Sequence, residues 1–552
     1  MTEDKGLKFR AILNDKYDIE EAKKFTLKPW HRTVLFFLGV AAVLNLLAVL
    51  YVTGGKAIFF WDDATYWDIS RRIVSGGMNE GGFWTNVYNS VALEDYNYIA
   101  ALPTAAVMSV FGTSRLAYVL GLVNMYLFPS TIVIYQLAKK ISKAPKLAMV
   151  ITLVIMPCIA FLTFIGFVDV GGLLICLICF NTYYPKKDGE VRFWRYPVIG
   201  LLLVAAILWR RYFAFFSVSF ITAMVADVAL FKRKWYGLAA VALVAGGILV
   251  LFFRDFVFYK LMGDYGNLYA GYKFELMTDF KLITRYFGLI FILGLAVFSG
   301  FIGIKKKENK VVFLWLQIIV CLVMFLSTQT HGQQHLLLYV PSLIVLTLIT
   351  IKHITKEWML LAVCAVAALH TIFVYIPRPQ PHNIQEIKSL ALIPTFSMIP
   401  EQRTDTEEIL ALKQRLDEVV YEGDTLGVLA SSFTLNEDIL KNVEPSLGIK
   451  QTRDNYIVSL PQVDSRDRNL SPLYNVNYVL VALPVQTHLA EGSQTVVTEA
   501  VKSFEVYADI ATAYEEIYDC ETVIDDMTIK LFHRVRNEER ADIAEFEGRL
   551  YH

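Results

Sequence analysis

The sequence predicts a mainly α-helical protein that crosses a membrane about eleven times and carries a C-terminal α/β domain outside it. Of its 552 residues, 55% are hydrophobic and 14% are aromatic. A soluble protein needs a smaller fraction of hydrophobic residues than this to build its core, so most of the chain is expected to lie in lipid. The net charge is zero, but residues 378–552 carry 30 acidic and 16 basic side chains. This distribution predicts a basic membrane domain, an acidic soluble domain and no nucleic-acid partner.

Eleven apolar stretches predict the transmembrane helices. The first covers residues 33–52, and 20 residues at about 1.5 Å each give about 30 Å, enough to cross the hydrocarbon core. The others lie at 116–138, 147–167, 170–184, 196–209, 212–231, 235–253, 286–304, 311–328, 336–351 and 358–376. The membrane domain is therefore predicted over residues 33–376, with a long polar loop at 53–102.

Lysine and arginine gather in every second loop, which determines the predicted orientation because positively charged loops stay in the cytoplasm. These loops contain Lys139, Lys140, Lys143 and Lys146; Lys186, Lys187, Arg192 and Arg195; Lys232, Arg233 and Lys234; Lys305, Lys306, Lys307 and Lys310; and Lys352 and Lys356. The N-terminal tail, residues 1–32, belongs to the same basic set. We therefore expect a cytoplasmic tail, an extracytoplasmic loop 53–102 and an extracytoplasmic C-terminal domain at 377–552.

The C-terminal segment alternates helical and strand patterns, which is typical of a small α/β domain. Helices are predicted over 410–420 and over most of 495–517, and strands over 425–430, 478–483 and 527–535. Cys520 is the one cysteine of this segment, so no disulfide is expected within it.

Asp62 and Asp63 follow a run of aromatic residues shortly after the first span. Asp62 and three later apolar or aromatic residues recur at near-helical spacing, which predicts a short amphipathic helix over 65–74 along the membrane interface. Carboxylates held there can act on a substrate that arrives in lipid and reacts at the water boundary. The alternative is that Asp62 or Asp63 only caps this helix, since aspartate is a favoured N-cap residue.

Three further charged residues lie where apolar spans meet at the predicted outer face. Asp169 comes about 23 residues after Lys146, or about 34 Å along a helix, so it lies near the outer surface. Its alternative role is in a tight turn beside Gly171. Arg210 and Arg211 can snorkel to lipid phosphates, or they can bind a substrate phosphate through the fork of guanidinium donors.

A polar stretch at residues 328–335 precedes the tenth span. It contains His331 and His335, and Tyr339 follows four residues later. Two histidines four residues apart can ligate a metal from one helical turn, although Gly332 between them weakens that interpretation. The alternative is an interfacial loop with no catalytic role.

These motifs, in this order, resemble the GT-C superfamily of glycosyltransferases that use polyprenyl-phosphate sugars. The similarity is to the branch of protein O-mannosyltransferases and lipid A aminoarabinose transferases. That branch has an Asp-Glu or Asp-Asp pair in the first outer loop and then an interfacial helix ending in glycine, which residues 61–66 and 73–76 match.

Three further family motifs have counterparts in this chain. The family has an acid that opens the fourth span, matched by Asp169, and a basic residue near the outer end of a middle span, matched by Arg210 or Arg211. Residues 335–341 match its late basic-aromatic-Pro motif loosely, with His335 where the family often has arginine.

The resemblance implies a GT-C catalytic domain and an inverting sugar transfer. The first acid of the pair is the family's general base, which implies that role for Asp62 and an orienting or binding role for Asp63. The leaving lipid phosphate gains charge and needs cations near it. The substrate-binding residues expected on this basis are Asp169, Arg210, Arg211, His331, His335 and Tyr339.

The predicted function is transfer of a sugar from a polyprenyl-phosphate donor to a hydroxyl of a cell-envelope acceptor, which can be a glycan, a teichoic acid, a lipid or a protein. Two alternatives stay open: a transporter or flippase of lipid-linked sugars, and a metal-dependent lipid-linked phosphotransferase. The unusual charges gather at the outer face rather than at mid-membrane, which favours surface chemistry over transport. No cofactor is predicted with certainty, and the Asp pair is compatible with a divalent metal. We expect the protein in a bacterial plasma membrane.

Overall fold

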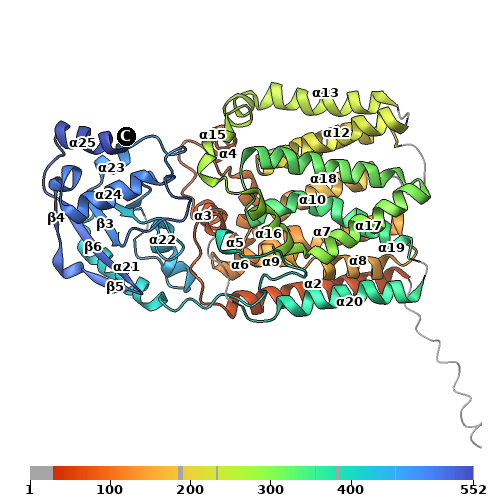
Figure 1. Cartoon of the computed structure of the whole chain (residues 1–552), viewed down its shortest axis with the longest axis horizontal. Helices are drawn as coiled ribbons and strands as arrows, with labels where there is room; N and C mark the ends of the chain where they lie inside the picture. The colour runs from red at the N-terminus through yellow and green to blue at the C-terminus, as the bar shows by residue number, and fades with distance from the viewer. Residues whose placement is uncertain are drawn as a thin grey trace, which may run out of the picture.

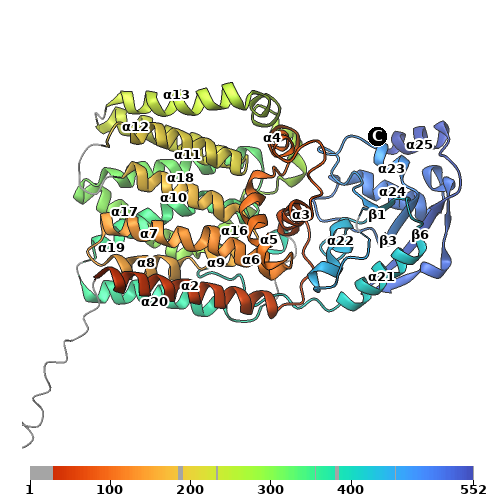
Figure 2. The same cartoon turned by 180° about the vertical axis from the view of Figure 1, so that it is seen from behind.

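The computed structural model describes residues 29–184, 191–231, 234–354, 356–378, 384–453 and 455–550. The molecule has two parts. A bundle of roughly parallel helices forms the larger part, and the C-terminal α/β domain sits at one end of that bundle (Figures 1 and 2). Most of the predicted tail, residues 1–28, lies outside the described residues, as do Lys186, Lys187, Lys232 and Arg233 of the basic loops.

Helices occupy all eleven positions where apolar spans are predicted. They are α2 (Pro29–Thr53), α6 (Arg115–Leu122) continuing through η2 (Val123–Leu127) into α7 (Phe128–Ile141), the pair α8 (Pro145–Ile155) and α9 (Cys158–Phe164), α10 (Asp169–Tyr183), α11 (Arg195–Trp209), α12 (Phe213–Phe231), α13 (Trp235–Phe252), α17 (Leu289–Lys306), α18 (Asn309–Thr328), α19 (Val340–Lys352) and α20 (Glu357–Val374).

Among the described residues, seven helices are long and apolar enough to cross a membrane alone. The pair α8 and α9, bent by 65°, would make an eighth crossing. Helices α10, α11 and α19 have 15, 15 and 13 residues, which is shorter than a typical span. The protein is therefore an integral membrane protein, and the number of eleven crossings stays a prediction.

The outer helices of the bundle present apolar side chains outward. Leu46 of α2, Leu251 of α13, Val297 of α17 and Leu361 of α20 are all exposed. A soluble protein rarely leaves so large an apolar surface uncovered, whereas lipid covers it at no cost. These faces are the lipid-contacting surface of the bundle.

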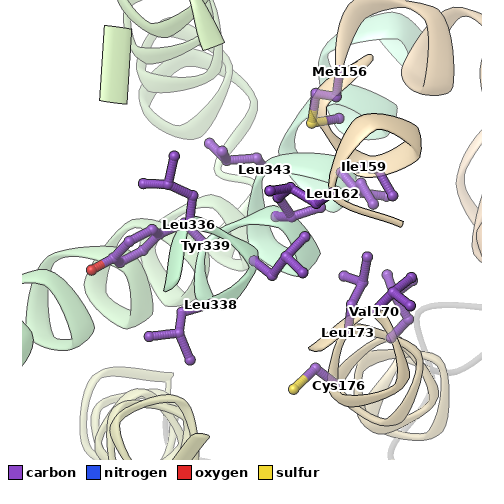
Figure 3. Packing of buried hydrophobic residues seen from close by; sticks show 14 of the residues in the cluster. Met156, Ile159, Leu162, Val170, Leu173, Cys176, Leu336, Leu338, Tyr339 and Leu343 are labelled. Carbon is purple, nitrogen blue, oxygen red and sulfur yellow. The ribbon is translucent and has the colours of Figure 1, made fainter. Parts of the chain in front are cut away.

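Buried apolar packing inside the bundle holds the polar stretch at residues 328–335, which precedes α19, in place. Leu336 and Leu338 belong to η5 (Gln333–Leu338), and they lie in one buried cluster with Leu162 of α9, Leu173 of α10 and Leu343 of α19 (Figure 3). Because η5 packs directly on α9 and α10, the side chains just before and within it are held close to the start of α10.

The connections at the domain end of the bundle contain short helices. The first connection holds α3 (Asp62–Val74), α4 (Phe83–Leu93), η1 (Ile99–Ala101) and α5 (Leu102–Phe111). The helix predicted over 65–74 is thus confirmed, and it begins three residues earlier, at Asp62. The connection is longer than the predicted loop 53–102, because it also includes α5. A second connection holds α14 (Arg254–Phe256), η3 (Val257–Leu261), α15 (Tyr265–Leu268), η4 (Ala270–Tyr272) and α16 (Leu276–Phe287).

The C-terminal domain is built on a six-stranded mixed sheet in the order β2-β1-β3-β6-β4, with β5 paired to β6. The strands are β1 (Leu426–Leu429), β2 (Ile457–Val458), β3 (Tyr478–Leu483), β4 (Tyr514–Glu516), β5 (Thr522–Ile524) and β6 (Met527–Arg534). Strand β1 runs parallel to β2 and β3, with Leu426 opposite Tyr478, and β6 runs antiparallel to β3. The three predicted strands are confirmed.

Helices cover both faces of this sheet. Alternate side chains of β3 point to opposite faces, so Tyr478 and Leu480 pack in one core while Val479 and Val481 pack in the other. The first core is closed by α21 (Thr406–Val419) and α22 (Glu437–Ser446), and the second by α23 (Ser471–Asn475), α24 (Thr495–Val506) and α25 (Arg540–Leu550). The predicted α/β domain is therefore a three-layer sandwich.

The prediction that most of 495–517 is helical is wrong in its second half. Helix α24 ends at Val506, because Tyr507 adopts a left-handed conformation with φ 53°. Strand β4 then uses residues 514–516 to pair with β6. Sheet pairing overrides the local helical pattern here.

The domain docks on the segment that carries the Asp pair. The backbone N–H of Phe59 donates to Ser446 Oγ at 3.2 Å, and that of Trp61 donates to Asp438 Oδ2 at 3.0 Å. Arg71 of α3 also donates to Asn442 Oδ1 of α22 at 3.1 Å. Helix α3 therefore lies between the bundle and the domain.

Candidate active site

A cavity of about 1820 Å³ lies between the bundle and the C-terminal domain. Its wall combines charged, aromatic and apolar side chains from both parts. The bundle contributes Asp62, Asp63, Arg210, Arg211, His331 and His335, and the domain contributes Phe433, Glu437, Gln462, Arg466 and His488. Six of the eight predicted site residues therefore line one cavity, and Asp169 and Tyr339 lie behind its wall, exposed by only 1% and 4%.

Asp62 and Asp63 are the first two residues of α3, and the N-cap is Trp61, which has φ 47° and ψ −133°. No side chain makes a cap hydrogen bond at this helix. The alternative that Asp62 or Asp63 only caps the helix is therefore wrong. Both carboxylates instead belong to the first turn of the helix.

The carboxylate of Asp62 is held by three groups from distant parts of the chain. Tyr96 O–H donates to Oδ1, Gln334 Nε2 donates to Oδ2 at 2.7 Å, and Arg210 Nη2 lies 3.8 Å from Oδ1. The side chain keeps 28% of its surface exposed. Asp62 is thus oriented by donors while it still faces the cavity, which is the arrangement that a general base requires.

Asp63 has a different environment from its neighbour. Burial raises the pKa of Asp63 to about 7, Arg115 opposes the rise, and Asp62 and Glu401 add to it. Arg115 donates to the backbone carbonyl of Asp63 at 2.7 Å and to that of Ile165 at 2.6 Å. The guanidinium of Arg115 thereby holds the backbone at Asp63 in place, and neither of these two hydrogen bonds goes to the Asp63 carboxyl group.

Arg210 joins the Asp pair to the start of α10. Its Nε lies 3.4 Å from Asp169 Oδ1, and Tyr212 O–H donates to the same carboxylate. The guanidinium also lies over the rings of Tyr66 and Tyr96, 5.1 and 4.9 Å from their centroids. Asp169 is therefore not a simple turn residue: it is a buried carboxylate that positions Arg210 beside Asp62.

Arg211 points to a different group of side chains, although it is adjacent to Arg210 in sequence. Its Nη1 donates to Asp95 Oδ1 at 2.8 Å, and Lys260 Nζ donates to the same oxygen at 2.9 Å. Arg211 Nη2 also donates to the hydroxyl oxygen of Tyr269. Two cations therefore share one carboxylate, which leaves this part of the wall positively charged.

His331 belongs to a buried chain of hydrogen bonds. Its Nδ1 lies 2.6 Å from Asp279 Oδ1, and its Nε2 lies 2.6 Å from the Tyr339 hydroxyl. The ring stacks on Phe325 with centroids 4.2 Å apart. Both ring nitrogens are thus engaged, and Tyr339 acts by holding His331 in place rather than by facing the cavity.

His335 is a neutral side chain in this structure. Its Nδ1 accepts a hydrogen bond from the N–H of Gly332 at 2.8 Å, so this nitrogen carries no proton. Burial, followed by His331 and Arg210, lowers the pKa of His335 well below its ordinary value. His335 stands where the family of the resemblance often has arginine, but a neutral imidazole supplies no positive charge to a phosphate. No group of three or more His, Cys, Asp or Glu side chains is placed to hold a metal ion among the described residues.

Tyr96, Gln334 and Asp95 are among the residues of this site that sequence reasoning did not single out. Gln334 lies within the polar stretch at 328–335, so its position before an apolar span was a usable signal. Tyr96 and Asp95 carry no comparable signal, because their partners lie 34 and 116 residues away. Lys260 belongs to a connection rich in tyrosines and bases, where no single residue stands out.

Solved structures are similar to this chain, although no protein-family model and no curated protein matches its sequence. ArnT from Cupriavidus metallidurans in the apo state, a lipid A aminoarabinose transferase, superposes with a TM-score of 0.57 at 10% identity, covering 91% of this chain and 98% of ArnT. ArnT bound to undecaprenyl phosphate gives a TM-score of 0.54 at 10% identity, covering 90% of this chain and 97% of ArnT. At this identity the similarity shows a shared fold, which agrees with the predicted helical membrane bundle and C-terminal α/β domain.

Proposed function

We propose that the protein is an inverting glycosyltransferase that moves a sugar from a polyprenyl-phosphate donor to a hydroxyl of a cell-envelope acceptor. The observation that carries the proposal is Asp62, an oriented carboxylate in a large cavity, within 3.8 Å of Arg210. The fold shared with ArnT, which has been solved with undecaprenyl phosphate, supports this choice. We place the reaction at the extracytoplasmic face of a bacterial plasma membrane, since the basic loops lie at the opposite ends of the helices.

The apolar part of the cavity suits a lipid chain. Phe215 and Val218 of α12, Leu249 of α13 and Met324 of α18 line it, and these helices are long and apolar enough to cross the membrane. Val218 is 44% exposed, so this wall reaches the lipid-facing surface of the bundle. A polyprenyl chain can enter between these helices while its phosphate stays in the polar part of the cavity.

The positive side chains suit the phosphate of such a donor. Arg211 and Lys260 share the single carboxylate of Asp95, so an additional anion beside them is favourable. Arg210 precedes Arg211 in the chain, and its Nη2 lies 3.8 Å from Asp62 Oδ1. When the C1–O bond to phosphate breaks, the leaving oxygen keeps the electron pair, and fixed cations stabilise the charge that develops there.

Asp62 supplies the general base for the acceptor. As the acceptor hydroxyl attacks C1 of the donor sugar, its proton passes to the Asp62 carboxylate, and the new glycosidic bond forms on the face opposite the phosphate. Tyr96 and Gln334 hold the carboxylate in one orientation during this step. A single displacement of this kind inverts the anomeric configuration.

A donor panel tests this function. The purified protein is incubated with synthetic polyprenyl-phosphate sugars and candidate acceptors, with and without EDTA, and the products are analysed by NMR. We expect a product of inverted anomeric configuration and free polyprenyl phosphate. Transfer of a phosphosugar that EDTA abolishes would instead identify a metal-dependent phosphotransferase. Movement of intact donor across proteoliposomes without transfer would identify a transporter.

A further inference from the structure

The C-terminal domain presents the carboxyl ends of its parallel strands to the cavity. Phe433 follows β1, Ser459 and Gln462 follow β2, and His488 follows β3, and all four residues line the cavity wall. The carboxyl ends of parallel strands are the usual place for a ligand in open α/β sheets, because the loops that follow diverge there. The domain therefore contributes a candidate binding surface and not only a lid.

Three rings form an aromatic shelf on this surface: Trp61, Phe433 and His488. The centroid of Trp61 lies 4.3 Å from that of His488 and 5.2 Å from that of Phe433. His488 is neutral, since burial lowers its pKa to about 4, and its Nδ1–H donates to the carbonyl of Ser431 at 2.8 Å. Such rings pack well against the apolar C–H faces of sugars.

The backbone of Trp61 is strained in order to place its ring on this shelf. A φ of 47° with a ψ of −133° is rare for a bulky residue, and such strain persists where function requires it. The hydrogen bond from Trp61 N–H to Asp438 Oδ2 and the packing on Phe433 hold this conformation. Because Asp62 is the next residue, the shelf lies directly beside the proposed base.

Glu437 provides a buried acceptor at the edge of the shelf. Its side chain lines the cavity and the residue is only 7% exposed. Oε1 accepts a hydrogen bond from Ser459, but Oε2 has no hydrogen-bond partner among the described residues. A buried carboxylate oxygen without a donor is unfavourable, so this position suits a ligand with hydroxyl groups.

The charge next to Glu437 disfavours a phosphate group at this position. Lys441 is shared by Glu437 and Asp438, at 3.6 and 3.8 Å, so two carboxylates face one ammonium group. Residues 378–552 as a whole carry 30 acidic against 16 basic side chains. This field repels polymers that carry phosphate groups and tolerates uncharged ones.

We propose that the aromatic shelf and Glu437 form the acceptor subsite, and that the acceptor is a neutral glycan rather than a teichoic acid, a phospholipid or a protein. A sugar ring packs on Trp61 and Phe433 and donates hydroxyl hydrogen bonds to Glu437. A further hydroxyl of the same glycan then reaches Asp62. This inference rests on the proposed function, and it specifies which acceptor that function uses.

The test measures binding without donor or turnover. Detergent-solubilised full-length protein is applied to an array of neutral and phosphate-bearing bacterial glycans, and affinities for the bound glycans are measured by titration. We expect neutral glycans to bind and Glu437→Gln to weaken binding about 10- to 100-fold, as expected for loss of hydrogen bonds to a charged group. Phe433→Leu should weaken it about 2- to 10-fold.

The matched control is Glu515→Gln, because Glu515 is exposed on the edge strand β4. It should bind glycans as the unmodified protein does, and the melting temperatures of all variants show whether they fold. Preference for phosphate-bearing glycans, absence of neutral-glycan binding, or equal affinities for Glu437→Gln and Glu515→Gln would each overturn the subsite. Because binding is measured without a donor, a failure of sugar transfer does not affect this test.

Discussion

Asp62 and Asp63 are adjacent in the chain but have different surroundings. Asp62 faces the cavity with both oxygens held by donors, whereas burial raises the pKa of Asp63 to about 7. A pKa near the working pH favours general-base catalysis, so by its pKa Asp63 is also a candidate for the general base. Orientation toward the cavity and proximity to Arg210 favour Asp62, and substitution can separate the two.

The first prediction is that Asp62→Asn lowers turnover by about 10²–10⁴-fold with little change in melting temperature. Asparagine keeps the shape and can keep a hydrogen bond from Gln334, but it cannot accept the proton of the acceptor. Activity is measured by sugar transfer and stability by thermal unfolding. Near-normal turnover in this variant would contradict the role of Asp62. Loss of turnover in Asp63→Asn, together with an acid limb near pH 7 in the unmodified protein, would assign the base to Asp63.

A second prediction concerns the stability of the protein against pH. The folded pKa of Asp63 is raised from 3.8 to about 7, so the folded state binds a proton that the unfolded state has already released between these values. Stability is therefore lost as pH rises through this window. Asp63→Asn removes the ionisable group, so it should raise the melting temperature more at pH 8, above the whole window, than at pH 5, where only part of the stability has been lost. An equal change at both pH values would mean that Asp63 titrates normally.

The connection between α11 and α12 places two adjacent arginines in different settings. Arg210 neutralises Asp169, which is 1% exposed, whereas the partner of Arg211 is Asp95, whose side chain is 54% exposed. Removing a partner from a buried charge is far more destabilising than removing one from an exposed charge. The two arginines therefore differ as targets for mutation.

We predict that Arg211→Ala weakens donor use by about 10- to 150-fold while the melting temperature changes little, because a charge-assisted phosphate contact is lost. Arg210→Ala should reduce donor use too, but it should also destabilise the protein by about 3–5 kcal/mol, since Asp169 then lacks its cation. Donor titrations and thermal unfolding of both variants check this. An unaltered apparent donor affinity in Arg211→Ala would leave only a contact with lipid headgroups for this residue.

At the scale of the whole molecule, helix α3, which begins with the Asp pair, lies at the end of the bundle that carries the C-terminal domain (Figure 2). The tips of the basic loops, such as the one at Lys306, lie at the other end. Positive loops face the cytoplasm, so the cavity is expected to face outward. The native Cys520 is only 5% exposed, so a membrane-impermeant thiol reagent would not report on this domain through it.

The orientation is therefore tested with introduced cysteines. Asp526→Cys places a thiol on an exposed turn of the domain, and Lys306→Cys places one at the far end of α17. We expect an impermeant maleimide to label Asp526→Cys in intact cells and Lys306→Cys only after permeabilisation. The reverse pattern would place the cavity in the cytoplasm and contradict an extracytoplasmic reaction.

The sequence by itself determined the elements. Helices in lipid must satisfy their backbone hydrogen bonds within the segment, so an apolar stretch of sufficient length predicts a helix without knowledge of its neighbours. The same local reasoning identified α3 from its helical spacing and the strand at 478–483 from its short apolar run. It failed after Val506, where pairing of residues 514–516 with β6 decides the conformation.

Only the tertiary structure decided which side chains meet. Gln334 reaches Asp62 across 272 residues, and Asp438 holds the backbone of Trp61 across 377 residues. Side-chain partners depend on which helices lie side by side and on where each side chain points, and neither is encoded in local spacing. The protonation state of His335 is an example. The hydrogen bond from the Gly332 N–H and the burial that keep this side chain neutral exist only in the folded chain.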